Sequence, residues 1–377
     1  MADALSPERL ARRYRTFAQA EGSGSPLYAH LAAAIADDPE LIAVLGQARP
    51  GQQLPVTLFA AVHDQVLAGR APLLGRYYGS VGGTAPASDA FPAFRHFCLS
   101  EQTRLLETLA RRNVQTNEVR RSVGVHLALR VAARLTGADA VGLVELGTSA
   151  GLLLELDRYR YLIDGEVSGD PDAPLTLATE LRGPHRPPPD RPLDVIGRVG
   201  VDTHPLDPAD PDDARWLRAC LWPDQPERDA RLRAALAIAT ANPAERVEGD
   251  AVDDGPRLAA AVPSDALPVV FHTWALAYVD RERRTLLAGR LAQLGRSRRM
   301  VEISLEAPGI AAAIEVPDAT DAGLPDGVWD EAASVLGLVV HHGDGTVTSG
   351  SLARVHAHLD WAAWAPTGAV AQSLGAR

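Results

Sequence analysis

A strand-to-helix turn at residues 144–151 carries the side chains with the clearest chemical use. Its sequence, VELGTSAG, follows a short apolar run and precedes LLLELDRY, which indicates a strand, a glycine-rich turn and a helix. Glu145 ends the strand, and the small residues Gly147, Ser149 and Gly151 alternate after it. Because small residues let the backbone approach a ligand closely, the spacing predicts a ligand site beside the Glu145 carboxylate.

Acidic residues follow at the ends of later predicted strands. Asp202 ends VIGRVGVD, and Asp250 follows VEG. Asp164, which ends YRYLID, is a rival to Asp202 because it lies nearer to the turn in sequence. Open α/β sheets bind ligands at the carboxyl ends of their strands, so these acids are expected at the same edge as Glu145.

This series of acids resembles class I S-adenosylmethionine (SAM) methyltransferases over about residues 138–306. The resemblance implies that Glu145 orients the methionine end of SAM and that the small residues of the turn make room for the cofactor. It also implies that Asp202, or Asp164, holds the ribose hydroxyls and that Asp250 lies near the adenine amine. The chain departs from that family by an insertion near 160–195.

The fourth predicted strand, VVFHTWA, ends in His272, Thr273 and Trp274. The resemblance places catalysis or substrate contact at this strand end. Methyl transfer depends mainly on holding donor and acceptor in line, so one base is enough. His272 is therefore predicted as the catalytic base, and Thr273 and Trp274 as substrate-binding residues.

The same turn also spells G-x-S-x-G, the nucleophile elbow of serine hydrolases. Ser149 would then be the nucleophile, with Asp250 and either His272 or His341 completing a triad. Against this reading, residues 1–137 have helical patterns, so no strand with a glycine-rich oxyanion loop is expected before the turn. The hydrolase remains an alternative.

The segment VQTNEV places Asn117 and Glu118 just before the helix that leads into the first predicted strand. An amide and a carboxylate at this position are suited to substrate contact. A helix cap formed by residues Thr116 to Glu118 explains the same segment equally well.

Several kinds of function are excluded by composition. The net charge of -11 disfavours nucleic acid as a partner. The 37 basic residues are all arginine, which excludes lysine-dependent pyridoxal and P-loop chemistry. No apolar stretch reaches the roughly 20 residues of a membrane span, and the N-terminus has no secretory signal pattern. A cytoplasmic protein without membrane contact, acting on a small molecule, is expected.

No metal site is predicted. The two cysteines, Cys98 and Cys220, lie on apolar helix faces, which suits a reducing compartment. The remaining candidates are histidine pairs without a carboxylate or cysteine at ligand spacing, namely His341 with His342 and His356 with His358.

The elements that must position these residues fall into two parts. Helical patterns fill residues 1–134, which are expected to form a helical domain or lid. From 135 to 377 strands and helices alternate, with YRYLIDG and LTLATELRG resembling a hairpin. The predicted fold is an α/β protein with a mostly parallel, Rossmann-like sheet and a C-terminal antiparallel strand pair.

Over nearly its full length the chain also resembles an uncharacterised bacterial family of unknown function, through VQTNEV joined to the E-x-G-x-S-A-G turn. That likeness implies no activity. The site therefore carries the prediction, which is SAM-dependent methyl transfer to a small molecule. The alternatives are a non-catalytic SAM or nucleotide-binding protein and the serine hydrolase.

Overall fold

The computed structural model describes residues 5–20, 24–49, 52–115, 117–183, 185–311, 314 and 333–375. The chain divides into two compact units, each built from two stretches of sequence. The first comprises residues 1–117 and 207–233, and the second comprises 118–206 and 234–377. Among the described residues, every helix is too short or too polar to cross a membrane.

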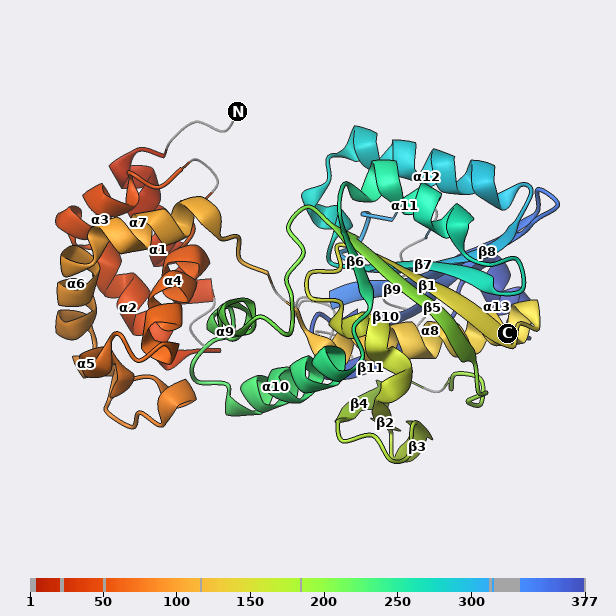
Figure 1. Ribbon diagram of the computed structural model, residues 1–377, viewed down its shortest axis with the longest axis horizontal. Helices are drawn as coiled ribbons and strands as arrows, with labels where there is room; N and C mark the ends of the chain where they lie inside the picture. Colours follow the sequence, from red (N-terminus) through yellow and green to blue (C-terminus); the bar gives the residue numbers. More distant parts are fainter. Residues whose placement is uncertain are drawn as a thin grey trace. The chain divides into compact units, whose positions relative to one another are not determined.

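The first unit is helical (Figure 1). Its helices are α1 (Pro7–Ala20), α2 (Pro26–Ala36), α3 (Pro39–Leu45), α4 (Pro55–Leu67), α5 (Pro72–Gly75), η1 (Gly79–Val81), η2 (Ala87–Asp89), α6 (Phe91–Ser100), α7 (Gln102–Arg111) and α9 (Pro211–Ala219). Several begin with proline after a polar cap: Ser25 accepts a hydrogen bond from the amide of Tyr28, and Asp38 and Asp210 cap α3 and α9 likewise. Proline suits the first helical turn because its missing N–H would have no partner there.

Aromatic side chains form the centre of this unit. The ring of Tyr28 stacks on Phe59 with a centroid distance of 4.3 Å, and Tyr14 and Phe94 meet Phe59 edge-on. These four side chains come from α2, α4, α1 and α6 and are all buried. Their burial joins helices that are distant in sequence into one core.

The second unit contains an 11-stranded sheet of order β3-β2-β4-β11-β10-β9-β8-β7-β1-β5-β6. Its strands are β1 (Ala140–Leu146), β2 (Arg160–Ile163), β3 (Glu166–Gly169), β4 (Thr176–Arg182), β5 (Asp194–Asp202), β6 (Glu245–Glu248), β7 (Leu267–Thr273), β8 (Arg299–Glu306), β9 (Ala333–His342), β10 (Val347–His356) and β11 (Trp361–Trp364). Its helices are η3 (Val119–Arg121), α8 (Ser122–Thr136), η4 (Leu152–Arg158), α11 (Ala251–Ala261), η5 (Leu276–Tyr278), α12 (Arg281–Gly295) and α13 (Gly368–Leu374). Helix α10 (Pro226–Ala241) begins in the first unit and ends in the second.

The predicted fold class is confirmed. Strands β6-β5-β1-β7-β8-β9 have the order 3-2-1-4-5-6 of a doubly wound sheet when they are counted from β1. The first five are parallel, and β9 runs antiparallel to β8. The expected C-terminal antiparallel pair is β9 and β10.

Helices cover both faces of this sheet (Figure 1). Helices α11 and α12 bury an apolar cluster that includes Val144, Leu146 and Val270. On the other face α8 lies so close to β8 that a Cβ added at Gly124 would be 2.6 Å from Leu305 Cδ1. Side chains that alternate along β1, β7 and β8 point to opposite faces of the sheet. They therefore belong to two different hydrophobic cores, one beneath α11 and α12 and the other beneath α8.

The segment near 160–195 differs from the expected hairpin. Strand β2 pairs in parallel with β4, and its antiparallel partner is the short strand β3 between them. Strand β4 in turn pairs with β11, so this segment extends the sheet at the end remote from β1. The hairpin prediction was wrong because it was based on neighbours in sequence, whereas β4 is stabilised by a strand from the C-terminal end of the chain.

The boundary between the units also differs from the predicted one after residue 134. Helix α8 lies in the second unit, because its buried residues pack on β8 and β9. Residues 207–233, which include α9, lie in the first unit.

Candidate active site

The candidate site lies where the strand order reverses. After β1 the sheet continues on one side through β5 and β6 and on the other through β7 and β8. Such a switch point leaves a crevice at the carboxyl ends of the strands, where doubly wound proteins bind ligands. The ends of these strands carry Glu145, Asp202, Thr273 and Glu306.

The turn after β1 has the strained geometry that small residues tolerate. Gly147, Ser149 and Gly151 have φ angles of 76°, 52° and 74°. The amide of Gly147 donates to the carbonyl of Val201 at 2.8 Å, which ties the turn to β5. A Cβ added at Gly147 would lie 2.5 Å from Ala275 Cβ, so close packing and the positive φ both require glycine at this position.

The segment after the turn is not the α-helix expected from sequence. Residues Leu152–Arg158 form the 3₁₀ segment η4, interrupted by non-helical angles at Glu155. Glu155 is buried and accepts a hydrogen bond from Arg158 Nε at 2.8 Å. The turn therefore has no long helix behind it, and the amides of Thr148 and Ser149 are already bonded to the Val201 carbonyl and the Asp202 carboxylate.

Glu145 lies directly behind the turn and is almost inaccessible to solvent, with 3% of its surface exposed. Its Oε2 accepts a hydrogen bond from Thr148 Oγ1 at 2.7 Å. Burial raises the pKa of Glu145 to about 8; the Thr148 hydrogen bond acts in the opposite direction, and the negative charge of Asp202 raises it further. A cation placed beside this carboxyl would stabilise its ionised form.

The structure separates the two candidate ribose acids. Asp202 ends β5, the neighbour of β1, and its carboxylate accepts the amide hydrogens of Ser149 at 2.9 Å and His204 at 2.8 Å. Asp164 lies after β2, at the remote end of the sheet, where it pairs with Arg186 at 3.1 Å. Only Asp202 of these two lies at the glycine turn.

Asp250 lies beside Asp202, because the amide of Gly249 donates to the Asp202 carbonyl at 2.9 Å. Its Oδ1 caps α11 by accepting from the amides of Val252 and Asp253, and it also pairs with Arg283 at 2.6 Å. All of these bonds use Oδ1, so within the described part of the chain Oδ2 can still accept from another donor.

His272 is paired with an acid that the sequence prediction did not include. Its Nδ1 lies 2.9 Å from Glu306 Oε1, and both side chains are buried. Glu306 Oε1 also accepts from the amides of Ala275 at 2.9 Å and Leu276 at 3.0 Å. Burial alone would raise the pKa of Glu306, but these hydrogen bonds and His272 lower it overall. The feature of the sequence that could have identified Glu306 was its position at the end of β8, the strand that follows β7 along the chain.

Register places Glu145 and His272 on opposite faces of the sheet. His272 lies opposite Leu146 of β1 and Ser304 of β8, and residues in register share a face. Glu145 immediately precedes Leu146 and so points to the other face. A ligand that contacts both side chains must therefore lie across the strand ends.

The predicted substrate residues at the end of β7, Thr273 and Trp274, are held by contacts within the protein. Trp274 has a φ of 54°, and its Nε1 donates to Ser334 Oγ at 2.8 Å. The guanidinium of Arg121 lies 5.9 Å from the Trp274 ring and donates to the Thr273 carbonyl at 3.4 Å. These contacts fix the loop that borders the turn, and the Thr273 carbonyl is already engaged.

Asn117 ends the first unit, and Glu118 begins the second. The buried Glu118 carboxylate caps the turn of η3 by accepting from the amide of Arg120 at 3.2 Å. Asn117 Nδ2 is buried without a hydrogen-bond partner in the described part of the chain. Thr116, the other residue of the predicted cap, lies outside the described residues. In the described residues, Glu118 therefore acts as the cap. The segment that it caps, η3, packs against η4.

Two of the other histidines are each engaged with a single acid. His341 Nε2 lies 2.6 Å from Glu302, and His356 Nδ1 lies 2.9 Å from Asp360. Within the described ranges, no group of three or more His, Cys, Asp or Glu side chains could hold a metal ion.

Comparison with known proteins groups the chain by sequence. No curated protein and no solved structure matches it. A match to a sequence family extends over residues 11–364 and so includes both VQTNEV and the glycine turn. The chain belongs to this family, DUF2332, described as uncharacterized proteins conserved in bacteria.

Proposed function

We propose that the second unit binds SAM at the carboxyl ends of β1, β5 and β6 and transfers its methyl group to a small molecule. The observation that carries this proposal is the buried Glu145 behind a positive-φ turn at the switch point of the sheet. The neighbouring strand supplies Asp202 at the same edge.

The residues present fit the chemistry of this cofactor. SAM carries two cationic groups, a sulfonium and an ammonium, together with two ribose hydroxyls. Glu145 would face a cationic group, and Asp202 the hydroxyls. An ionised carboxylate has about four lone-pair sites. Since Asp202 uses two of them for the amides of Ser149 and His204, it can still accept from hydroxyl donors.

His272 is suited to remove a proton from the methyl acceptor. Nδ1 donates to Glu306, so the neutral ring carries its lone pair on Nε2. Nε2 has no partner among the described residues. The buried carboxylate also stabilises the imidazolium that forms when Nε2 takes a proton. Positioning of donor and acceptor supplies most of the remaining catalysis.

The first prediction is that SAM and S-adenosylhomocysteine bind and raise the melting temperature. A ligand at a hundredfold excess over its dissociation constant adds about 2.7 kcal/mol of stability. Asp202→Asn should weaken binding at least tenfold, about 1.4 kcal/mol, in isothermal calorimetry. Asp164→Asn, the matched control at the remote end of the sheet, should bind like the wild type. Absence of heat at millimolar ligand would remove the proposal.

A serine hydrolase is the second candidate, because two observations favour it. Ser149 has a φ of 52° in a turn that follows a strand, as a nucleophile elbow requires. The pair of His272 and Glu306 supplies a histidine with its orienting acid. Asp250, the acid expected from chain order, pairs with Arg283 instead. In the described part of the chain, the elements before β1 are helical, so they offer no strand for an oxyanion loop.

Substitutions at Ser149 separate the two candidates, and this is the second prediction. Ser149→Gly should retain SAM binding within about 1.5 kcal/mol, since glycine adopts the positive φ without strain. Ser149→Leu should abolish SAM binding, because its side chain would fill the space beside the turn. Wild-type protein should not react with a fluorophosphonate probe. Labelling that disappears in Ser149→Ala, together with indifference to SAM, would instead establish the hydrolase.

A further inference from the structure

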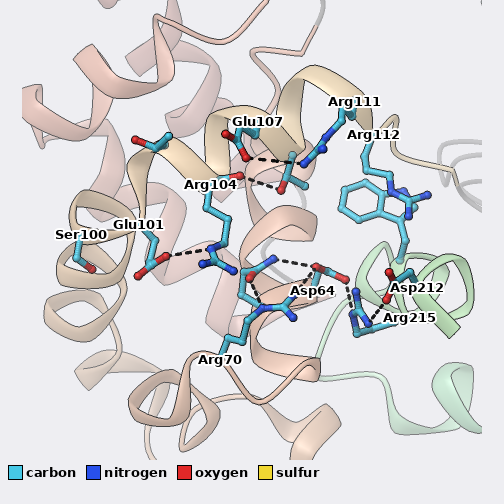
Figure 2. Close-up of a pocket in the computed structure, with 14 residues that line it drawn as sticks. Asp64, Arg70, Ser100, Glu101, Arg104, Glu107, Arg111, Arg112, Asp212 and Arg215 are labelled. Carbon is cyan, nitrogen blue, oxygen red and sulfur yellow. Dashed lines mark hydrogen bonds and ion pairs between the residues drawn. The ribbon is translucent and has the colours of Figure 1, made fainter.

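We propose that the first unit binds a phosphorylated small molecule in a hollow between α4, α7 and α9. The hollow has a volume of about 950 Å³ and is lined mainly by polar side chains (Figure 2). Five arginines line it, namely Arg70, Arg104, Arg111, Arg112 and Arg215. It lies within the first unit, and the inference does not rest on methyl transfer.

The arginines reach the hollow from three parts of the unit. Arg104 and Arg111 are seven residues apart on α7 and so share one face of that helix. Arg70 follows α4, and Arg215 belongs to α9. Figure 2 shows Arg104 extending from α7 toward Asp64 and Arg70. An anion in the hollow can therefore receive hydrogen bonds from more than one direction.

Three of these side chains keep donors for a ligand. Arg70 donates through Nε to Gln65 at 2.7 Å, and Arg104 donates through Nε to Glu101 at 3.2 Å. Their terminal nitrogens make no hydrogen bond within the described residues, and the nearest acid to Arg70 is Asp64 at 3.6 Å. For Arg111, the described residues offer a single 3.9 Å ion pair, with Glu107. Since a guanidinium has five N–H donors, most of them remain available.

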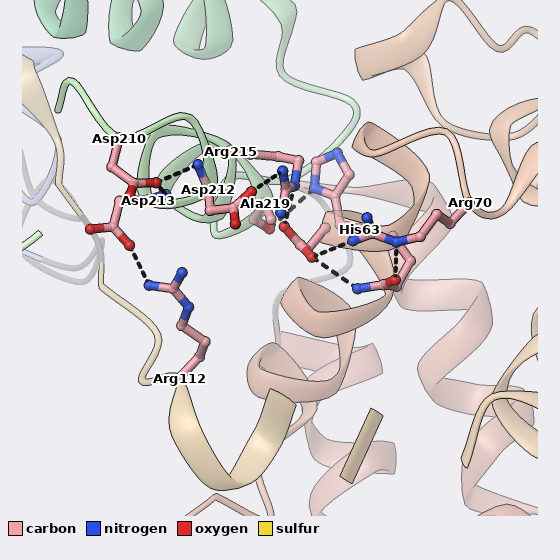
Figure 3. A network of polar contacts seen from close by, with 10 residues as sticks. His63, Arg70, Arg112, Asp210, Asp212, Asp213, Arg215 and Ala219 are labelled. Carbon is pink, nitrogen blue, oxygen red and sulfur yellow. Dashed lines mark hydrogen bonds and ion pairs between the residues drawn. The ribbon is translucent and has the colours of Figure 1, made fainter. Parts of the chain in front are cut away.

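The other two arginines belong to a rigid frame (Figure 3). Arg215 donates to the buried Asp64 at 2.7 Å and to Asp212 at 2.7 Å, which joins α9 to α4. Arg112 pairs with Asp213 at 2.5 Å and lies 5.9 Å from the centre of the Trp216 ring.

His63 adds a second bond between α4 and α9. Its Nδ1 donates to the carbonyls of Ala219 and Leu221 at 3.1 Å, and its Nε2 accepts from Ser80. Burial lowers the pKa of His63 to about 4, so the ring stays neutral and this arrangement persists at physiological pH. The side of the hollow formed by α4 and α9 is thus fixed before a ligand binds, which reduces the cost of ordering that side.

The acids around the hollow are weak competitors for a strongly charged ligand. Of the four acids in the lining, Glu101 and Glu107 are 40% and 62% exposed, and exposed ion pairs along one helix contribute little. The other two, Asp64 and Asp212, already accept hydrogen bonds from Arg215. A planar carboxylate can be satisfied by a single guanidinium fork, whereas a phosphate group offers three terminal oxygens and nearly two charges. Arginines that converge from several directions therefore favour a phosphoryl group. The volume suits a whole metabolite and exceeds what inorganic phosphate fills.

The third prediction tests this site with the full chain and two probes, inorganic phosphate and pyrophosphate. Phosphorus NMR and calorimetry should show saturable binding at millimolar concentration or below, tighter for pyrophosphate. Arg70→Gln and Arg104→Gln should each weaken binding at least tenfold. Arg76→Gln is the matched control, because Arg76 is an exposed arginine of the same unit outside the hollow. It should bind like the wild type.

Arg104→Lys keeps the charge and loses the bidentate fork, so it should bind more weakly than the wild type and more tightly than Arg104→Gln. This variant guards against a folding defect in the glutamine variants, which circular dichroism will reveal. The proposal would be overturned if the wild type and all variants bound phosphate and pyrophosphate equally well. It would also be overturned if chloride at matched ionic strength gave the same binding signal as these probes. Tighter binding of citrate than of pyrophosphate would replace the phosphoryl group by a carboxylate ligand and overturn it too.

Discussion

Replacement of Glu306 by alanine is expected to destabilise the second unit more than any other substitution at the candidate site. The change removes the acceptor of three donors: His272 Nδ1 and the amides of Ala275 and Leu276. Glu306 is 1% exposed, so water cannot easily replace it. Buried polar groups left without a partner cost about 1 to 3 kcal/mol each. Urea unfolding should therefore show a loss of roughly 3 to 9 kcal/mol.

Glu306→Gln is the matched control for this experiment. All three donors bond to Oε1, while Oε2 is buried without a partner among the residues that the structure describes, so a glutamine can keep every hydrogen bond through its amide oxygen. The variant should fold with stability close to the wild type. Because it lacks the charge beside His272, any turnover that uses His272 as a base should fall by at least tenfold. Equal destabilisation by the alanine and glutamine variants would show that Oε1 is not the shared acceptor.

The second large effect is expected at Glu145, where burial makes stability depend on pH. Its carboxyl ionises near 4.5 in the unfolded chain and near 8 in the folded protein. Between these values the folded state holds a proton that the unfolded state has lost. The stability that Glu145 contributes is thus complete below pH 4.5 and is lost as pH rises toward 8. With about 1.36 kcal/mol for each pKa unit, roughly 3 kcal/mol is lost by pH 7.

Glu145→Gln should remove this pH dependence. The glutamine oxygen can still accept from Thr148 Oγ1, and no charge forms in the buried site. Urea unfolding should show a variant similar to the wild type at pH 4.5 and more stable than it at pH 8. Glu248→Gln, at an exposed strand end, should follow the wild type at both pH values. If the stability of the wild type changed with pH in the same way as that of Glu145→Gln, this result would contradict the raised pKa of Glu145.

Local sequence determined the elements and many of their ends. Apolar runs rich in branched residues became β1 and β7, and the small residues at 147, 149 and 151 became a turn with positive φ at all three positions. Polar residues followed by proline became helix starts, as at Ser25 and Asp38. These features are predictable because a cap, a turn and an apolar period each depend on residues only a few positions apart.

Only the tertiary structure decided which strand ends share an edge. By sequence, Asp202 was the predicted ribose acid and Asp164 its rival. Pairing of β5 with β1 placed Asp202 at the turn, while β2 joined the sheet at its remote end. The bond between His272 and Glu306 spans 34 residues and exists because β7 and β8 are parallel neighbours. Strand order depends on burying every apolar face of the unit at once. No short segment of the sequence contains that information. The acids could therefore be predicted as residues at strand ends, but the groups that they contact could not.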